Sequence, residues 1–222
     1  SKAVQPGVYT SFKQLITAMQ SNLVGVYKLA ADMTADEVGL PDNKTSYLSG
    51  EFTGMLIGTD GSKAYAIYDL RKPLFDTLRG ATVKDLDVKN VDIDSDENAA
   101  AIAKVADTAK INNVAVEGKI SGRKSVAGLV VSATNTTIEN SAFTGKLVAN
   151  HTASNAKYAG GIAGNLIGEN ARINKSKVDV KISSSSRNTD QVAGGIVGRL
   201  ENGALVSNSV ATGEIRNGQG YS

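Results

Sequence analysis

Residue types that could support acid–base, nucleophilic or metal chemistry are scarce in this sequence of 222 residues. His151 is the single histidine, and the chain contains no cysteine. A zinc protease needs two histidines and a glutamate as His-Glu-x-x-His on one helix, and a hydrolase of the α/β type needs a Gly-x-Ser-x-Gly elbow. Neither motif occurs, so we expect no catalytic residue and no metal ligand here. We interpret His151 as a solvated loop residue.

A run of carboxylates, DLDVKNVDIDSDEN, suggests calcium chemistry. Asp92, Asp94 and Asp96 have the 1-3-5 spacing of an EF-hand loop. However, Glu97 stands where that loop requires glycine, and Ala103 stands where it requires a bidentate glutamate. We therefore interpret residues 85–97 as a solvated loop. Because some polysaccharide lyases cluster carboxylates around calcium, calcium binding by this run stays open.

A glycine-rich octapeptide occurs twice, as AGGIAGNL at 159–166 and as AGGIVGRL at 193–200. A glycine-rich loop can hold a phosphate, but this one lacks the Lys-Ser/Thr of a P-loop and the acidic residue of a dinucleotide fold. We therefore expect structural glycines, which permit positive φ or close approach of neighbouring backbones. They are Gly160, Gly161, Gly164, Gly194, Gly195 and Gly198.

Five further segments share a second template, in which an apolar residue leads and alternation follows. They are VKDLDVKNVD, INNVAVEGKI, IENSAFTGKL, INKSKVDVKI and VSNSVATGEI. Their first residues are Val83, Ile111, Ile138, Ile173 and Val206, a loose period of about 30 residues. The alternation of apolar with polar residues in the second half of each copy is the period of a strand.

Asparagine recurs at the third position of this template, as Asn113, Asn140 and Asn208, with Asp85 and Lys175 in the other two copies. Asparagine tolerates left-handed backbone and bonds neighbouring peptide groups. We expect these residues to stack at a corner of the fold.

These repeats predict an all-β fold, a right-handed parallel β-helix over residues 46–222. A single strand cannot bury its apolar face alone, so the copies must stack in parallel about 4.8 Å apart. A leucine-rich repeat would show a different leucine scaffold, and a propeller would use more aromatic residues than the 5% found here. The last template is followed by a short polar stretch, so we expect the solenoid to be truncated at its C-terminal end.

Residues 1–45 differ from the repeats and predict an N-terminal cap made of a helix and a strand. Apolar residues lie at helical spacing after Thr10 or Ser11, either of which can serve as N-cap. They are Phe12, Leu15, Ile16 and Met19. Such a helix would cover the first turn, because an open solenoid end exposes strand edges and core.

The segments that join the repeats, 121–125, 148–158 and 183–192, vary in length at one position of the repeat. We expect them to project from one side of the solenoid, where length variation often marks a contact surface. His151, Tyr158 and Arg187 are the side chains there best able to anchor a partner. The alternative is that these are variable solvated loops without a partner.

The charge balance of 24 Lys and Arg against 22 Asp and Glu argues against nucleic-acid binding driven by phosphate contacts. No run of about 18 apolar residues occurs, so we expect no membrane span. Without cysteine there is neither a disulfide framework nor a thiolate metal site.

The linked glycine motifs and Asn-Ser strands resemble the short glycine-rich repeats of bacterial surface proteins. More specifically, YLSGEFTGMLIGTDG, YAIYDLRKPLFDTLRGATVKDLDVKNVDI and AGGIVGRLENGALVSNSVATGEIRNGQGYS resemble the N-terminal region of the Gram-positive immunoglobulin A1 protease family of zinc metalloproteases. The resemblance runs from about Val26 to Ser222.

This resemblance implies a large, extracellular, cell-wall-associated endopeptidase whose His-Glu-x-x-His helix and zinc lie far C-terminal to these residues. The present segment would then be a non-catalytic β-helix without a cofactor, which positions or gates the catalytic domain. The implied partners are the rest of the parent protease and a host immunoglobulin or other glycoprotein. The residues leave open an alternative, a stand-alone glycan-binding or polysaccharide-lyase-like solenoid of a surface adhesin.

Overall fold

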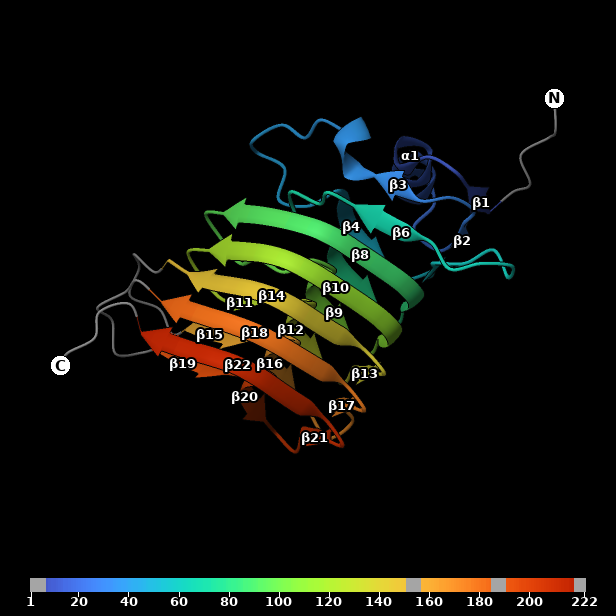
Figure 1. Ribbon diagram of the computed structural model, residues 1–222. Coiled ribbons are helices and arrows are strands. Elements are labelled where there is room, and N and C mark those ends of the chain that lie inside the picture. The colour runs from blue at the N-terminus through green and yellow to red at the C-terminus, as the bar shows by residue number, and fades with distance from the viewer. Residues whose placement is uncertain (1–6, 151–156, 185–190, 218–222) are drawn as a thin grey trace, which may run out of the picture.

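The protein was analysed as a computed structural model that describes residues 7–150, 157–184 and 191–217. Strands dominate, and every pair of named strands in the described residues is parallel. Figure 1 shows successive turns of the chain stacked in chain order, with the helical N-terminal part at one end. Within the described residues, no helix has the length and apolar character needed to cross a membrane.

A sheet of 13 strands forms the broad front layer of Figure 1. Its central path is β1 (Val8–Tyr9), β2 (Val26–Leu29), β5 (Met55–Ile57), β8 (Thr82–Ser95), β10 (Lys110–Gly122), β13 (Thr137–Glu139), β17 (Arg172–Asn174) and β21 (Leu205–Ser207). It also contains β3 (Met33–Thr34), β6 (Ala66–Tyr68), β14 (Ala142–Ala149), β18 (Lys177–Ser184) and β22 (Val210–Asn217).

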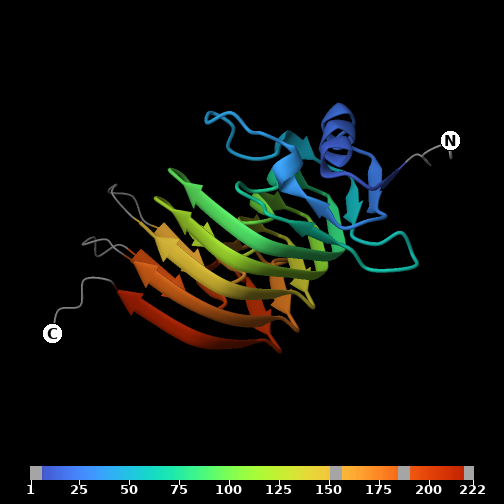
Figure 2. The same ribbon diagram turned by 45° about the horizontal axis from the view of Figure 1, so that its top comes forward.

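Two smaller sheets complete the stack. The sheet of six strands contains β4 (Leu48–Phe52), β7 (Phe75–Arg79), β9 (Ala103–Asp107), β12 (Val130–Thr134), β16 (Ala163–Ile167) and β20 (Val197–Glu201). The sheet of three strands contains β11 (Val126–Ala127), β15 (Lys157–Gly160) and β19 (Gln191–Gly194). The view of Figure 2 shows the long front strands curving over the strands behind them. The apolar core lies between these layers.

The leading apolar residues of the five sequence repeats form one column across the long sheet. Val83 pairs with Ile111, and the pairing continues through Ile138, Ile173 and Val206. The prediction of stacked parallel strands in this register is confirmed.

The same column extends further toward the N-terminus than the sequence repeats indicated. Tyr27 pairs with Leu56, and Leu56 pairs with Val83. Both of these earlier residues are buried. Their turns escaped the sequence comparison because the surrounding segments keep the register without keeping the Asn-Ser template.

At the corner after this column, the backbone is left-handed in all five repeats. The φ angles are 54° at Asp85, 56° at Asn113, 49° at Asn140, 51° at Lys175 and 49° at Asn208. The Asn113 amide also donates to the Asp85 carboxylate at 3.0 Å. Lys175 adopts the same conformation without an asparagine side chain, so the turn geometry is imposed by the stack rather than by residue type alone.

A column of serines follows the corner on its buried side. The backbone N–H of Ser141 donates to the Ser176 hydroxyl at 3.3 Å, and that of Ser176 donates to the Ser209 hydroxyl at 3.1 Å. The Ser176 hydroxyl in turn donates to the Asn174 carbonyl at 3.1 Å. Each buried hydroxyl therefore satisfies peptide groups on two adjacent turns, which apolar side chains could not do.

The predicted N-terminal helix is α1 (Phe12–Ser21), and a short 3-10 helix, η1 (Ala35–Glu37), follows β3. Ser11 rather than Thr10 is the N-cap, since its hydroxyl accepts from the N–H of Gln14 at 3.4 Å. The four predicted apolar residues of α1 are all buried. Strand β2 already pairs with β5, so strand pairing crosses residue 45, and the division into 1–45 and 46–222 stays a prediction.

Candidate functional site

The long strands β8, β10, β14 and β18 all end on one side of the stack, at the left of Figure 1. We call this side the loop edge. Its position follows from the topology, because the carboxyl ends of parallel strands meet at a common edge. Of the three side chains predicted to anchor a partner there, Tyr158 is described, whereas His151 and Arg187 lie outside the described residues.

Tyr158 lies on β15 and contacts the next turn of the chain. Its hydroxyl accepts a hydrogen bond from Arg199, whose guanidinium carbon lies 5.5 Å from the centre of the tyrosine ring. Arg199 also pairs with Glu201 at 2.9 Å. The hydrogen bond to Tyr158 and the charge of Glu201 raise the pKa of Arg199 above its ordinary value. Sequence reasoning missed Arg199, although it occupies the variable position before the last leucine of the glycine motif.

The glycines beside Tyr158 serve close packing of the backbone. None of the six predicted glycines has a positive φ, so that part of the expectation is wrong. Instead, a Cβ atom on Gly160 would lie 1.9 Å from the Ala163 carbonyl oxygen, and one on Gly194 would lie 1.9 Å from the Val197 oxygen. A Cβ on Gly161 would lie 2.3 Å from the carbonyl oxygen of Gly195 on the next turn. These peptides leave no space for a bound phosphate at the corner.

Two earlier copies of the glycine motif emerge from the strand register. Ala127 pairs with Gly160, and Gly160 pairs with Gly194. The segments AAAIA (99–103) and VAGLV (126–130) therefore occupy the same corner as the two octapeptides. Alanine replaces glycine at several positions there, which concealed the repeat from the sequence comparison.

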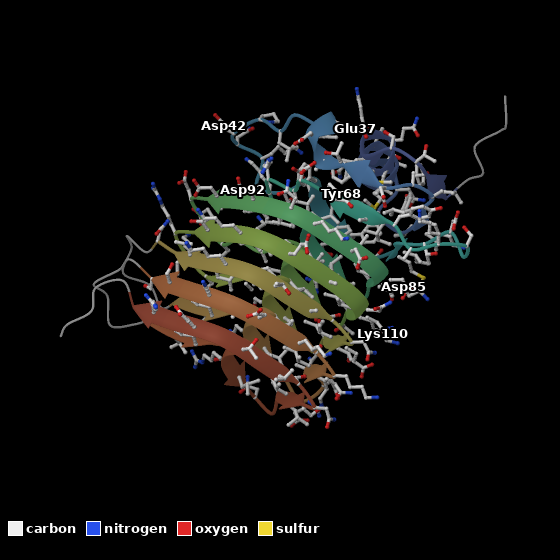
Figure 3. The ribbon with its side chains drawn as sticks, in the orientation of Figure 1. Glu37, Asp42, Tyr68, Asp85, Asp92 and Lys110 are labelled. Carbon is white, nitrogen blue, oxygen red and sulfur yellow. The ribbon has the colours of Figure 1, made fainter. Side chains whose placement is uncertain are left out.

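A cleft of about 410 Å³ opens at the N-terminal end of the loop edge. It lies between the loop before β4, the segment after β6 and the end of β8, and Figure 3 labels Asp42 on that loop and Asp92 on β8. Charged side chains of both signs line it: Asp42, Lys44, Arg71, Lys72, Asp94, Asp96 and Glu97.

The cations of this cleft already have partners. Arg71 pairs with Asp92 at 3.4 Å. The Lys72 ammonium group donates to the backbone carbonyls of Lys44 and, at 3.4 Å, of Asp42. Lys72 therefore fixes the overhanging loop to the stack. The third cation of the cleft, Lys44, donates to the Ser49 hydroxyl at 3.0 Å.

The acidic run forms a strand rather than the loop that we expected, because β8 extends to Ser95. Side chains two residues apart in a strand lie on one face at about 6.6–6.8 Å, too far apart to close around one ion as an EF-hand loop does. Three carboxylates of the run form ion pairs instead: Asp92 with Arg71, Asp96 with Arg123 at 3.4 Å, and Glu97 with Lys124. In the part of the chain that the structure describes, no three His, Asp or Glu side chains are grouped to hold a metal ion.

A polar network ties the overhanging loop to the stack beside the cleft. Lys104 on β9 pairs with Asp76 on β7 at 2.8 Å and donates to the Thr45 hydroxyl at 2.8 Å. Burial raises the pKa of the Asp76 carboxyl, but the contacts with Lys104, Ser46 and Thr45 outweigh it and leave that pKa below 3.8. The loop edge is therefore a preformed surface held in part by ion pairs.

Residues 1–118 match the family described as M26 IgA1-specific Metallo-endopeptidase N-terminal region, and residues 190–216 match the GLUG motif. The zinc metalloprotease ZmpC of Streptococcus pneumoniae serotype 4 (strain ATCC BAA-334 / TIGR4) is 74% identical over 222 residues, which cover 100% of this chain and 12% of that protein. An immunoglobulin A1 protease of Streptococcus sanguinis is 45% identical over 210 residues, 94% of this chain and 11% of that protein.

A solved structure described as IgA1 Protease superposes on this chain with a TM-score of 0.91 and 41% sequence identity. The superposition covers 98% of this chain and 17% of the solved one. The chain thus spans about an eighth of the length of the curated relatives that it matches, 12% and 11% for the two named above.

Proposed function

The chain belongs to the M26 IgA1-specific metallo-endopeptidase N-terminal region family, and we propose that it is a non-catalytic scaffold of a large zinc metalloendopeptidase. In this proposal the zinc and its ligands belong to a catalytic domain elsewhere in the parent protein. The names of the relatives, zinc metalloprotease and immunoglobulin A1 protease, support the parent activity. The lack of a metal-binding group among the described residues is consistent with a scaffold role.

The observation that carries the proposal is the unbroken register from Tyr27 to Val206. Each turn is paired by backbone hydrogen bonds with the turn before it and the turn after it. Such a stack is stiff along its axis, because bending it would break pairing in all three sheets at once. A stiff stack can hold a substrate-binding surface at a fixed distance and orientation from a distant active site.

We propose further that the stack is a right-handed β-helix. Connections between parallel strands are right-handed in nearly all proteins, because the strand twist favours that path. The parent protein would be extracellular, at the bacterial surface, and the loop edge would contact either its catalytic domain or a host glycoprotein such as immunoglobulin A1. The exposed Tyr158–Arg199 pair is the described part of that edge best suited to such a contact.

A stand-alone lyase receives less support from the structure. Lyase chemistry needs a base free to remove a proton, and the cleft cations Arg71 and Lys72 are held by Asp92 and by loop carbonyls. The cleft volume of about 410 Å³ would accept a polar ligand. Incubation of the chain with acidic polysaccharides would produce unsaturated sugars if this alternative were correct, and we expect none.

The scaffold role is tested by removing one turn from the full-length protease. Deletion of 138–172 takes out one repeat in register, because Thr137 and Arg172 are equivalent residues on adjacent turns. We expect the shortened protease to hydrolyse a short peptide at the normal rate but to cleave the intact glycoprotein more slowly. If the deletion variant cleaved the intact glycoprotein as fast as the wild-type protease does, a positioning role would be refuted.

A direct test of the non-catalytic assignment uses the present chain alone. We expect the purified chain, after dialysis against zinc, to retain no stoichiometric metal and to show no peptidase activity. One tightly bound zinc per chain would place metal ligands in this region and contradict the proposal.

A further inference from the structure

Three lysines stand in register on the outer face of the long sheet. Lys119 on β10 pairs with Lys146 on β14, which pairs with Lys181 on β18. All three side chains are exposed, and they are spaced by one strand separation of about 4.8 Å. We call Lys119, Lys146 and Lys181 the lysine column. It starts next to Asp92, which is labelled on β8 in Figure 3.

This arrangement places like charges side by side, and neighbouring carboxylates compensate it only at its two ends. Asp92 lies opposite Lys119 and Glu214 lies opposite Lys181, without forming an ion pair with either lysine. Like charges directly opposite each other on neighbouring strands repel, and the lysine column contains two such pairs. None of the three ammonium groups forms an ion pair or side-chain hydrogen bond with the part of the chain that the structure describes. The two carboxylates that end the column, Asp92 and Glu214, are themselves paired with Arg71 and Arg216.

The ends of the column define its length. Asp92 aligns with Lys119 on one side, and Glu214 aligns with Lys181 on the other. The positive stretch therefore covers three strands, and the backbone positions of its outer lysines are about 10 Å apart, which is two strand separations. This length matches the repeat of a linear disaccharide.

The surface beside the column suits sugar hydroxyls. A shallow depression of about 340 Å³ is lined by Gly118, Thr144, Gly145, Lys146, Asp179, Val180 and Lys181. Gly118 and Gly145 line it with backbone alone, at φ of 145° and 151°. The adjoining column of Glu117, Thr144 and Asp179 offers a hydroxyl and two carboxylates, which no described residue engages.

The spacing discriminates among classes of anionic ligand. An extended acidic peptide places side chains of one face about 6.6–6.8 Å apart, which matches neither one nor two strand separations. A DNA strand carries a phosphate about every 3.4 Å, which is shorter than one strand separation. A polysaccharide with one acidic sugar per disaccharide places its charges at the outer lysines and its hydroxyls over the depression.

We propose that the lysine column and the adjoining depression form a binding site for a linear acidic polysaccharide with one carboxylate in each disaccharide. The two outer lysines bind successive carboxylates, and the ammonium group of Lys146 donates hydrogen bonds to hydroxyls of the neutral sugar between them. This site is on the outer face of the sheet, apart from the loop edge, and it does not depend on the scaffold role proposed above.

Calorimetric titration of the chain with a hyaluronan oligosaccharide tests the proposal, since hyaluronan carries one carboxylate per disaccharide and no sulfate. We expect measurable binding at low salt that weakens as salt is added, because exposed charges are screened beyond a Debye length of about 8 Å at physiological ionic strength. Neutral dextran should not bind. No binding of hyaluronan above that of dextran would overturn the proposal.

The decisive variant exchanges two neighbours without changing composition, Thr144→Lys with Lys146→Thr. The new lysine would lie between Glu117 and Asp179, while the lysine column would lose its central charge. We expect the dissociation constant to rise about tenfold, as for loss of one hydrogen bond to a charged group, and the melting temperature to be equal or higher. Wild-type affinity in this variant would contradict the proposed site.

A control variant removes three lysines outside the column, Lys13→Gln, Lys84→Gln and Lys110→Gln. Binding should be nearly unchanged, and a loss equal to that of the exchange variant would show that lysines outside the column bind the polysaccharide as well, which would contradict a site confined to the column. Polyglutamate and single-stranded DNA complete the comparison. If either bound as tightly as hyaluronan, the assignment to an acidic polysaccharide would be wrong.

Discussion

The two ends of the stack are held together by different means. At the N-terminal end, aromatic rings pack in the core, with Phe52 and Phe75 at 4.9 Å and Tyr27 and Phe52 at 6.2 Å between ring centres. In the described turns after Phe143, the last buried ring of the core, small side chains, glycine contacts and hydroxyl ladders take over. The last turn leaves Leu200 and Leu205 half exposed, at 50% and 49%.

The column after the corner shows this difference at a single position. Leu86 and Val114 fill it in the earlier turns, whereas Ser141, Ser176 and Ser209 fill it in the later ones. The earlier turns thus gain stability from buried apolar volume, and the later turns from hydrogen bonds between identical positions. We conclude that apolar side chains close the core at the irregular end, whereas each turn of the regular end bonds to its neighbour through equivalent residues.

The largest expected effect comes from the irregular end. Phe75→Ala should lower the free energy of unfolding by about 3–5 kcal/mol, because it removes a fully buried ring and leaves a cavity. Leu205→Ala at the last turn should cost less than about 1 kcal/mol, because its side chain is already half in water. Urea denaturation measures both values. Equal losses would show that the two ends are not held differently.

A glycine in the regular turns should be nearly as sensitive as an aromatic residue. In Gly145→Ala, the new Cβ would lie 1.9 Å from the Gly118 oxygen at a φ of 151°. We expect a loss of about 2–3 kcal/mol, since strain and a backbone collision add. Gly39→Ala is the control, because nothing lies within 4 Å of its new Cβ, and it should be close to neutral. A neutral Gly145→Ala would argue against close stacking of these turns.

The serine column should contribute a smaller, local amount. Ser176→Ala removes the acceptor of the Ser141 N–H and should cost about 1–2 kcal/mol. Hydrogen exchange should accelerate at the Ser141 amide more than at amides of β4 or β7, which lie in the aromatic end. Uniform acceleration throughout the chain would mean that the ladder does not act locally.

The smallest effect concerns the ion pair that ties the overhanging loop to the stack. The lowered pKa of Asp76 means that its contribution is present above the unfolded pKa of about 3.9 and is lost as the pH falls through the lower folded value. Asp76→Asn should therefore cost less than about 1 kcal/mol at neutral pH and nothing at pH values below the folded pKa. A loss that persisted in strong acid would point to packing rather than to charge.

The part of the fold that could be predicted from the sequence also differs between the regular C-terminal turns and the irregular N-terminal ones. The repeats predict the strands of the regular turns and corner residues such as Asn113, because equivalent residues of successive copies pair with each other. The helical spacing of apolar residues predicts the capping helix. The turns of Tyr27 and Leu56 pair in the same register, but their sequences do not share the residues of the later repeats, so sequence comparison does not detect them. The alanine copies of the glycine corner were missed because alanine stands where the two octapeptides have glycine, as Ala127 does opposite Gly160, so the Gly-Gly pattern does not recur.

Of the candidate sites, the sequence indicated Tyr158 but not its partner Arg199, because their contact joins residues 41 positions apart. The lysine column was hidden for a related reason. Three lysines in separate repeats become a site only when the register aligns them, and a shift of one residue would turn one of them to the opposite face.

The register is the claim on which both proposals depend, and a cysteine pair tests it most directly in a chain that has no cysteine of its own. Thr144 and Asp179 pair across β14 and β18, so Thr144→Cys with Asp179→Cys should oxidise readily to an intramolecular disulfide. Thr144→Cys with Lys181→Cys, two residues out of register, should stay reduced under the same conditions. Faster oxidation of the second pair than of the first would contradict the register and, with it, the lysine column.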